Sequence, residues 1–396
     1  MTMEQTTYHT EEGTLVFLLP QRVDSASAPD VENAIDKART MFPDFPVVLD
    51  CSRLEYISSS GLRVILRLKK AAADTSLIEV SPEVYDILEM TGFTEMMDVR
   101  KAFRTFSTEG CEIIGQGSNG IIYRIDQETI VKAYRNPEAL DEIRNEQQLA
   151  RTAFILGIPT AIPYDVVRIA SGGYGSVFEL LDAAPLSSLL LEGKLTVEEA
   201  AERSIALLKT IHSTTVRPGS VPNMRLTALN WAAFLREYLE PDLSDKLERL
   251  LTGMPEDLHM LHGDYHIRNI LMQNDELLLI DMDTICHGHP VFELASMYND
   301  YIGYGELDPS VSPAFFGISQ ETATEFWNRS LHLYCGDLDA STIRSISEKA
   351  QVIGYMRIMR RSIRRIGFAD ETGRALIENC HRHLRELLPK IDSLLF

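Results

Sequence analysis

The chain has 396 residues, of which 38 are Lys or Arg and 58 are Asp or Glu, so its formal charge is −20. This charge repels polynucleotides and anionic membrane surfaces, and the ordinary share of apolar residues excludes a wholly disordered chain. The length fits two or three domains, each able to bury a core.

The N-terminal segment shows neither a secretory signal nor a membrane span. Residues 1–13 are polar and acidic where a signal peptide is basic and then apolar, and no stretch approaches the roughly 18 apolar residues of a span. The five cysteines are far apart and lack zinc-site spacing, which indicates reduced structural thiols. We therefore expect a cytoplasmic protein with no membrane or nucleic-acid partner.

Strands and helices alternate along residues 1–105. Short apolar runs typical of strands occupy residues 14–19, 46–51 and 76–80. Helices are predicted at residues 28–41, which carry Pro29 near their start, after Ser58, and at residues 83–89. This alternation predicts an α/β domain with a mixed, partly parallel sheet and helices, ending near residue 105.

After a short polar connection at residues 104–110, the pattern changes. Beta-branched runs dominate to about Leu181, and from about Thr196 nearly everything reads as helix. The predicted helices cover residues 197–212, 321–334, 341–365 and 371–395. We expect a small strand-rich lobe over residues 106–182 and a large helical lobe over residues 183–396.

A glycine-rich loop opens the second region. Gly115, Gly117 and Gly120 form a GxGxxG pattern that encloses Ser118 and Asn119. Alone this pattern is also found in dinucleotide-binding folds and in plain turns, but a strand-like segment follows it here, whereas a dinucleotide loop opens a helix. The sequence therefore favours a strand–loop–strand hairpin whose backbone covers the phosphates of ATP.

Lys132 is a single charge inside an apolar strand, twelve residues after Gly120. Such a lysine is often an edge residue with its ammonium in water. Its distance from the glycine loop instead favours a lysine that binds phosphate oxygens and needs a carboxylate to position it. Glu146 is the best candidate for that carboxylate, and Glu142, one turn earlier, is the alternative.

The segment HGDYHIRN at residues 262–269 is the strongest chemical signal, and an apolar strand ending at Asp281 follows it. Phosphoryl transfer needs a positioned acceptor, a carboxylate that takes or orients its proton, and metal ions. Asp264 suits the acceptor hydroxyl, while Asn269 and Asp281 offer the oxygen ligands that Mg²⁺ prefers. Separately these residues also fit a turn cap and a strand end, but their joint order and spacing favour the site.

With these motifs, residues 110–396 resemble the protein-kinase-like superfamily, and within it the aminoglycoside phosphotransferase and choline kinase branch, whose loop reads HGDxHxxN. The resemblance implies an α+β bilobal fold, a small lobe and a helical lobe, that uses ATP and Mg²⁺. It assigns Asp264 as the catalytic base, Asn269 and Asp281 as metal ligands, and Lys132, partnered by Glu146, as a catalytic, phosphate-binding lysine. The nucleotide would further contact Gly115, Gly117, Ser118, Asn119 and Gly120 in the loop and the hinge around Glu179 and Leu181. His266 matches a histidine that is structural in the family.

Departures from protein kinases bear on the acceptor. Gly263 and His266 occupy the places of the Arg before the catalytic Asp and the Lys after it, and the Asp-Phe-Gly and Ala-Pro-Glu motifs are missing. This favours a small acceptor with a hydroxyl or amine group. Because the glycine loop is close to the protein-kinase form, a protein acceptor stays an alternative, as does a nucleotide-binding scaffold without catalysis.

Arginines cluster late in the predicted helix at residues 341–365. They are Arg357, Arg360, Arg361, Arg364 and Arg365, and their spacing places several on one helix face. In one interpretation, this face binds an anionic substrate or docks the N-terminal domain. The interpretation we favour from sequence is an ordinary solvated or salt-bridged face.

Residues 1–105 resemble the STAS domain of anti-sigma factor antagonists, through the segments at residues 23–29, 47–51, 54–62 and 87–93. In that family a serine at a helix start is phosphorylated by a partner kinase, and it aligns with Ser59; Ser58 replaces the Asp that usually precedes it. The resemblance implies a regulatory module that binds a protein partner. The alternative is that residues 58–60 only cap the helix.

Overall fold

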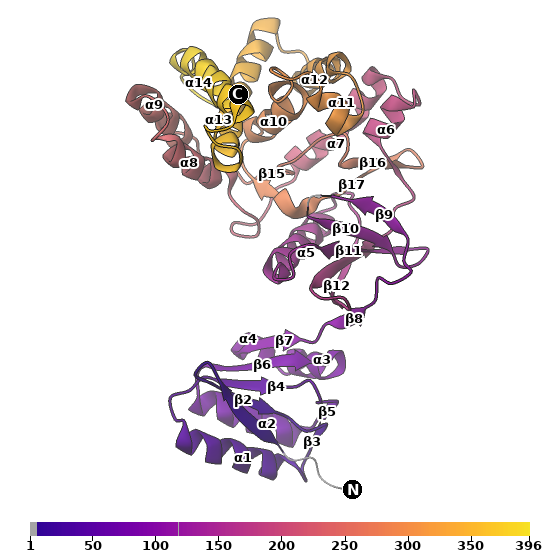
Figure 1. The fold of residues 1–396 in the computed structure, drawn as a ribbon, viewed down its shortest axis with the longest axis vertical. Coiled ribbons are helices and arrows are strands. Elements are labelled where there is room, and N and C mark those ends of the chain that lie inside the picture. Colours follow the sequence, from indigo (N-terminus) through magenta and orange to yellow (C-terminus); the bar gives the residue numbers. More distant parts are fainter. Residues whose placement is uncertain (1–5, 118) are drawn as a thin grey trace. The chain divides into compact units, whose positions relative to one another are not determined.

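The computed structural model describes residues 6–117 and 119–396, which divide into two compact units, Met1–Phe106 and Ser107–Phe396. The first unit contains a five-stranded sheet with the order β1-β2-β4-β6-β7 (Figure 1). Its strands are β1 (Thr7–Glu11), β2 (Thr14–Leu18), β4 (Val47–Asp50), β6 (Thr75–Val80) and β7 (Asp98–Lys101). Strands β2, β4, β6 and β7 are parallel and β1 is antiparallel to β2, which confirms the mixed sheet.

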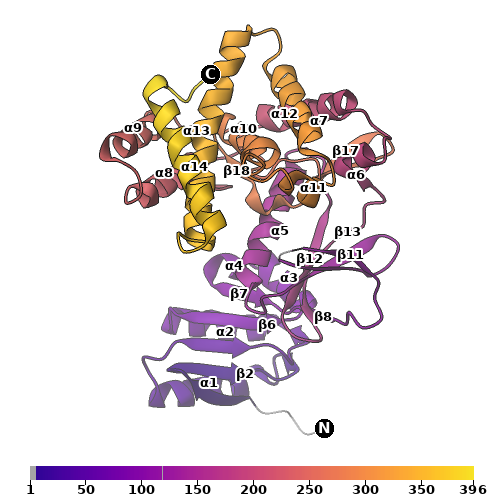
Figure 2. The same cartoon turned by 45° about the horizontal axis from the view of Figure 1, so that its top comes forward.

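Four helices accompany this sheet, and the pair α1 and α2 packs side by side (Figures 1 and 2). The helices are α1 (Ala28–Met41), α2 (Ser59–Ala71), α3 (Pro82–Met90) and α4 (Phe93–Met96). Helix α1 buries Val31, Ile35 and Ala38, because their spacing brings them to one face. A two-stranded sheet of β3 (Arg22–Val23) and β5 (Tyr56–Ile57) and the short strand β8 (Arg104–Phe106) complete the unit.

The second unit begins with antiparallel strands in the order β12-β13-β11-β10-β9. They are β9 (Ile113–Gln116), β10 (Gly120–Arg124), β11 (Thr129–Tyr134), β12 (Pro163–Ile169) and β13 (Tyr174–Glu179). Helix α5 (Leu140–Ile155) follows β11 and contacts β12 and β13. The glycine-rich segment therefore lies between two strands of a hairpin.

Helices dominate the rest of the unit. They are α6 (Leu186–Leu191), α7 (Val197–Ser213), α8 (Met224–Leu235), α9 (Pro241–Thr252), α10 (Val291–Tyr298), α11 (Val311–Phe316), α12 (Gln320–Cys335), α13 (Ala340–Arg365) and α14 (Glu371–Leu387). Figure 2 shows α13 and α14 lying along each other. Helix α14 ends at Leu387, before the expected residue 395, because Pro389 cannot continue an α-helix and a short 3₁₀ turn, Leu388–Lys390, follows.

Short strands interrupt the expected helical stretch. They are β14 (Ala184–Pro185), β15 (Met260–Leu261), β16 (Ile270–Gln273), β17 (Glu276–Leu279) and β18 (Cys286–His287). Strands β16 and β17 form a hairpin, and β15 pairs with β18. These pairings fix both ends of the segment between β15 and β16, which carries the HGDYHIRN sequence. The 3₁₀ turn Met282–Thr284 and the π-helical turn Asn299–Gly303 complete the unit.

Each unit has a separate apolar core. Leu15, Phe17 and Leu49 belong to the core of the first unit, and Tyr265, Phe326 and Tyr355 to that of the second. The five cysteines are free thiols: Cys51, Cys286 and Cys380 are buried, whereas Cys111 and Cys335 are partly exposed. Among the helices of residues 6–117 and 119–396, none has the length and apolar character needed to cross a bilayer.

Candidate active site

A cavity of about 310 Å³ lies between the strands of the second unit and its β16–β17 hairpin. Its polar lining consists of Asn119, Lys132, Glu146, Thr160, Glu179 and Asp281. Apolar side chains, among them Ile122, Phe178 and Leu271, form much of the remaining wall. The cavity thus combines an apolar compartment with a charged end, as a nucleotide-sized ligand requires.

The glycine-rich loop borders this cavity through Gly117, Asn119 and Gly120. Gly117 N–H donates to Gly120 C=O at 3.0 Å, and Arg135 N–H donates to Asn119 C=O at 3.0 Å. A Cβ at Gly120 would overlap the Ala133 carbonyl oxygen, so only glycine allows β10 and β11 to approach this closely. Ser118 lies outside the described residues, and Gly115 lies in β9 opposite Ile122, away from the cavity lining.

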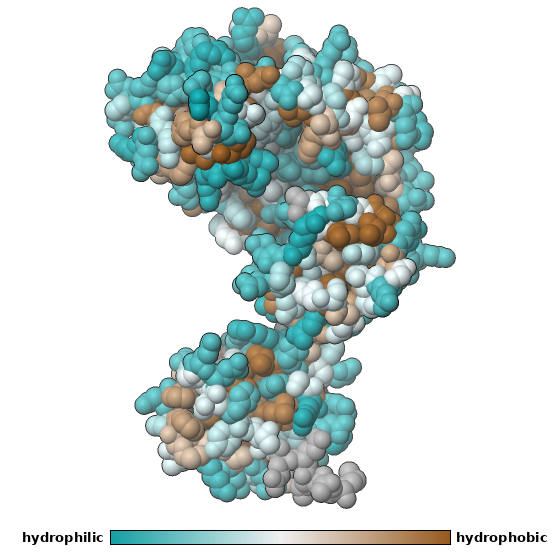
Figure 3. Space-filling model, in the orientation of Figure 1, coloured by the Kyte–Doolittle hydropathy of each residue, from teal (hydrophilic) through white to brown (hydrophobic). Residues whose placement is uncertain are grey.

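Hydrophobic side chains cover the outer strand of this lobe. Figure 3 shows the hydrophobic patch over β9, where Ile113 and Ile114 are exposed. Ile114 also lines the cavity. The mouth of the cavity is therefore partly apolar on the side of the glycine-rich hairpin.

Lys132 joins two carboxylates at the charged end of the cavity. Its Nζ lies 2.8 Å from Glu146 Oε1 and 3.4 Å from Asp281 Oδ1. Burial lowers the pKa of Lys132, but these carboxylates outweigh burial and raise the pKa above its ordinary value. The Tyr134 hydroxyl donates to Glu146 Oε2, and Glu142 is exposed. Of the two carboxylates considered, the structure places Glu146 at the lysine.

The segment after β15 presents Asp264 from a short loop. His266 Nε2 lies 3.5 Å from Asp264 Oδ2, and Asn269 Nδ2 donates to the Asp264 carbonyl at 3.1 Å. Burial raises the pKa of the Asp264 carboxyl, but His266, Arg357 and His262 outweigh burial and hold the pKa at about 2. Asp264 is thus ionised at neutral pH and able to accept a hydrogen bond from a hydroxyl.

Two carboxylates, Asp281 and Asp283, follow β17, and Asp281 lines the cavity. Asp281 has a left-handed backbone conformation (φ 63°, ψ 60°), which is uncommon outside glycine. Two residues later, burial and the charges of Asp281 and Glu146 raise the pKa of Asp283 to about 7. The charge of Lys132 lowers the pKa of Asp283, but burial and the repulsion between the carboxylates outweigh this effect. A cation would relieve this repulsion.

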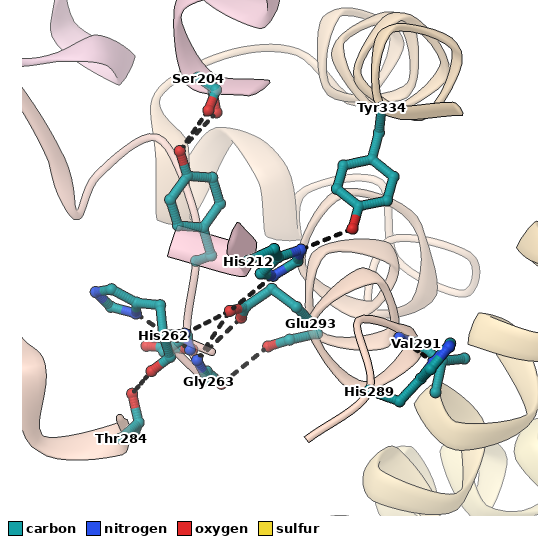
Figure 4. A network of polar contacts seen from close by, with 12 residues as sticks. Ser204, His212, His262, Gly263, Thr284, His289, Val291, Glu293 and Tyr334 are labelled. Atoms are coloured by element: carbon teal, nitrogen blue, oxygen red, sulfur yellow. Dashed lines mark hydrogen bonds and ion pairs between the residues drawn. The ribbon is translucent and has the colours of Figure 1, made fainter. Parts of the chain in front are cut away.

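Glu293 was not among the residues expected from sequence, yet it supports the Asp264 loop. This fully buried carboxylate accepts from His262 N–H at 2.5 Å and from Gly263 N–H at 2.9 Å, and His212 lies 3.8 Å away (Figure 4). Burial raises the pKa of Glu293, but His212 and the His262 amide outweigh it and lower the pKa. The sequence signal was a single glutamate inside an apolar helical run.

Gly263 allows this arrangement. Its φ is +83°, and a Cβ there would overlap the Thr284 carbonyl oxygen. Thr284 Oγ1 in turn donates to His262 C=O at 2.8 Å. The loop before Asp264 is therefore held from two sides, by α10 and by the turn after Asp281.

The expected hinge residues are also part of the cavity wall. Glu179 and Leu181 both line the cavity, and Glu179 Oε2 accepts from Ile162 N–H at 3.2 Å. Glu179 N–H donates to Ile162 C=O at 3.0 Å. The cavity thus brings together the predicted glycine loop, the lysine, its glutamate, the hinge and Asp281.

Ser59 lies in the first unit. It is exposed and is the first residue of α2, whose N-cap Ser58 accepts from Ser60 N–H at 3.2 Å. A Cβ at Gly61 would lie 2.7 Å from the Val23 carbonyl oxygen, so the helix start packs tightly against β3. Ser58 therefore caps the helix, while the Ser59 side chain is accessible.

This bilobal fold, with its lysine–glutamate pair and its Asp264 loop, defines a kinase-like phosphotransferase. The family model described as "Phosphotransferase enzyme family" matches residues 111–324, and the chain belongs to this family. A STAS domain matches residues 5–110. A putative anti-sigma factor antagonist, BtrV of Bordetella bronchiseptica, is 36% identical over 92 residues, which cover 22% of this chain and 78% of that protein.

Solved structures with a similar fold include phosphotransferases. The ADP-bound aminoglycoside phosphotransferase APH(2'')-Ib is 14% identical, with a TM-score of 0.47, over 80% of this chain and 99% of that one. A choline/ethanolamine kinase family protein from Mesorhizobium loti is 13% identical, with a TM-score of 0.47, over 71% of this chain and 88% of that one.

Proposed function

We propose that this phosphotransferase transfers the γ-phosphate of ATP, with Mg²⁺, to a small acceptor that carries a hydroxyl or amine group. The observation that supports this most is the contact of Lys132 with both Glu146 and Asp281 at one end of a single cavity. An ammonium held by two carboxylates is positioned for the phosphate oxygens of a nucleotide. The apolar wall and the hinge around Glu179 and Leu181 suit the adenine.

The donor set fits a magnesium ion. Asp281 and Asn269 offer a carboxylate and an amide oxygen, and Asp283 adds a second carboxyl group close enough to Asp281 for their charges to interact. Among the described residues, no group of three or more His, Cys, Asp or Glu side chains is arranged to hold a metal ion. Mg²⁺ is usually held by one or two carboxylates together with water and substrate phosphates, so this set is sufficient. Bound there, the ion would neutralise phosphate charge.

Asp264 accepts or orients the proton of the acceptor hydroxyl. The acceptor oxygen forms a bond to the γ-phosphorus as the bond to the β,γ-bridging oxygen breaks, and ADP leaves with that electron pair. Lys132 binds phosphate oxygens, and the backbone of Gly117 and Gly120 covers them. Glu293 keeps the loop of Asp264 in position through the amides of His262 and Gly263.

The test is ADP release with MgATP and a panel of sugars, amino alcohols, hydroxy acids, sugar phosphates and aminoglycosides. We expect acceptor-dependent ADP release with at least one class and none when EDTA replaces Mg²⁺. Nucleotide binding without turnover on any acceptor would favour a scaffold, and absence of nucleotide binding would contradict the proposal.

A second function, phosphorylation of Ser59, is favoured by its exposure at the start of α2. A phosphate at a helix N-terminus meets free amides and the positive end of the helix dipole. We propose that the STAS domain binds a protein partner through this region, where added charge of about −2 would weaken docking. Intact-mass analysis after incubation with MgATP tests the phosphorylation: wild type should gain one phosphate, and Ser59→Ala and Asp264→Asn none. An unmodified wild-type chain would rule it out.

A further inference from the structure

Five arginines near the end of α13 form a charged stripe that begins at the Asp264 loop. They are Arg357, Arg360, Arg361, Arg364 and Arg365. Arg357 Nη1 donates to the Gly263 carbonyl at 3.2 Å and to Ser296 Oγ at 2.8 Å. The carbonyl of Gly263 immediately precedes Asp264. The stripe therefore runs from the reacting end of the site along α13.

The arginines of the stripe have no carboxylate within ion-pair distance in the part of the chain that the structure describes. Within residues 6–117 and 119–396, none of the five forms an ion pair with Asp or Glu. Arg236, by contrast, pairs with Asp245 at 3.0 Å and with Glu248 at 2.9 Å. The absence of ion pairs contradicts the salt-bridged form of the face that we favoured from sequence, in a chain of charge −20. The solvated form of that face still fits Arg361, Arg364 and Arg365, which are exposed.

Arg360 is the most constrained member of the stripe. Its Nε is buried without a hydrogen-bond partner. Burial, and then the charge of Arg364 one turn later, lower the pKa of Arg360. The guanidinium therefore lies beside a like charge with an unused donor, an arrangement that an anion would stabilise.

Aromatic rings hold these guanidinium groups without neutralising them. Arg357 and Arg360 both lie 5.9 Å from the ring centroid of Trp231, and Arg360 lies 5.9 Å from that of Phe234. Arg361 Nη1 donates to the Tyr304 hydroxyl at 3.5 Å. Such contacts orient a guanidinium and leave its charge available.

Two acidic groups interact with the stripe through their charges: Asp264 with Arg357, and Asp300 with Arg357 and Arg361. Burial raises the pKa of Asp300 to about 7, although His266 and these two arginines act in the opposite direction. Asp300 is thus only partly ionised at neutral pH, and one of its oxygens is buried without a partner. Asp264 and Asp300 together therefore compensate the five arginines only in part, and the stripe keeps an excess of positive charge.

We infer that the phosphate acceptor is itself an anion, a small hydroxyl compound with a phosphate or carboxylate group that binds Arg360 and Arg361 while its hydroxyl faces Asp264. This inference rests on the proposed function. Along a helix, Arg360 and Arg361 lie about 4.5 and 6 Å beyond Arg357, so the anionic group is a few bonds from the hydroxyl. Cationic acceptors would meet like charge in the same place.

The fluorescence of Trp231 provides a direct measurement. The chain has two tryptophans, and Trp327 is buried in the core, so an anion at Arg360 changes the emission of Trp231. Protein with Mg²⁺ and a non-hydrolysable ATP analogue is titrated with glycerol 3-phosphate, glycerate, choline and kanamycin at low ionic strength. We expect saturable changes with the two anions and none with the cations. The stronger anion identifies phosphate or carboxylate as the preferred group.

Two variants link the signal to the stripe. Arg360→Glu with Arg361→Glu should weaken anion binding by about tenfold to a hundredfold, and the neutral pair Arg360→Gln with Arg361→Gln by about tenfold or more. Arg344→Glu is the matched control, because Arg344 is exposed on α13 thirteen residues before Arg357 and so on roughly the opposite face. It should bind anions like wild type.

The outcomes separate this inference from the proposed function. Analogue binding is measured independently in every variant and should be unchanged; if it is absent, the proposed function fails while anion binding can still be scored without nucleotide. The inference is overturned if neither anion binds, if choline or kanamycin binds as tightly, or if the control variant weakens binding as much as the stripe variants.

Discussion

At the residue scale, the site depends on charged side chains that lie close enough to shift each other's pKa. Lys132 is held by Glu146 and Asp281, and Asp264 by His266. These contacts keep Lys132 protonated and Asp264 ionised at neutral pH. The two groups therefore have the charges that phosphate binding and proton acceptance require.

Asp264→Asn should lower kcat by about 10²- to 10⁴-fold, because the amide cannot accept the proton of the acceptor. Asp264 does not line the nucleotide cavity, so nucleotide affinity should change little. Steady-state ADP release and nucleotide titration measure the two effects. Asp275→Asn, at an exposed turn residue between β16 and β17, is the control and should retain full activity. Wild-type kcat in Asp264→Asn would exclude a proton-transfer role.

Glu146→Gln should reduce the free energy of unfolding by about 1–3 kcal/mol and raise KM for ATP, because Lys132 loses its buried charge partner and keeps only the exposed Asp281. Glu142→Gln is a matched control, one turn earlier on α5 and exposed, with an expected change within about 0.5 kcal/mol. Urea unfolding and ATP kinetics compare the two variants. Equal effects would mean that the pair does not position the lysine.

At the element scale, two connections place the chemistry: the β9–β10 hairpin over the cavity and the Asp264 loop fixed by α10. The hairpin depends on the close approach of Gly120 to β11. The loop depends on Glu293, which accepts from two consecutive backbone amides. Both the hairpin and the loop are positioned through backbone atoms. Their geometry is therefore set by the packing of the strands and helices that carry these atoms.

Gly120→Ala should destabilise the protein by about 1–3 kcal/mol and weaken nucleotide binding, because the new Cβ displaces β10 from β11. Gly117→Ala, in the same loop, is the control for stability alone, since a Cβ there meets no atom within 4 Å while Gly117 itself borders the cavity. Thermal unfolding and titration with an ATP analogue distinguish them. An unaffected Gly120→Ala variant would show that the hairpin tolerates a wider spacing.

Periodicity and motif spacing predicted much of this structure. Residues 28–41 and the segment after Ser58 form α1 and α2, because their apolar residues share a helix face. Strand β1 was missed because it is polar and exposed, without the alternation that marks a buried face. Glu293 accepts from the amides of His262 and Gly263, which precede it by 31 and 30 residues. A contact over that separation produces no local sequence pattern, so it was not predicted. The spacing of the arginines in the sequence likewise cannot show whether carboxylates pair with them in the folded chain.

At the scale of the whole molecule, the two apolar cores share no residue. Two cores predict two unfolding transitions, each with its own sensitivities. A ligand that binds one folded unit stabilises that unit alone. In the full-length chain, the unfolding transition of the unit that is left unchanged can therefore serve as the internal reference for the transition of the other unit.

Calorimetry of the full chain should resolve two transitions. A magnesium-bound ATP analogue at about 100 times its Kd should stabilise only the transition of Ser107–Phe396, by about 2.7 kcal/mol. Gly61→Ala should lower only the other transition, because the added Cβ would lie 2.7 Å from Val23 C=O. A single transition that both changes shift together would show that the units unfold as one.

The positions of the cysteines allow local unfolding of each unit to be measured by alkylation. Cys51 is buried in one core, and Cys286 and Cys380 in the other, and burial raises the pKa of all three. An alkylating reagent reacts with the exposed thiolate, so each buried cysteine is labelled only when its surroundings open. Peptide mass analysis of timed alkylation then gives separate opening rates for the STAS and phosphotransferase units in the unaltered protein, with Cys111 and Cys335 as early-reacting references.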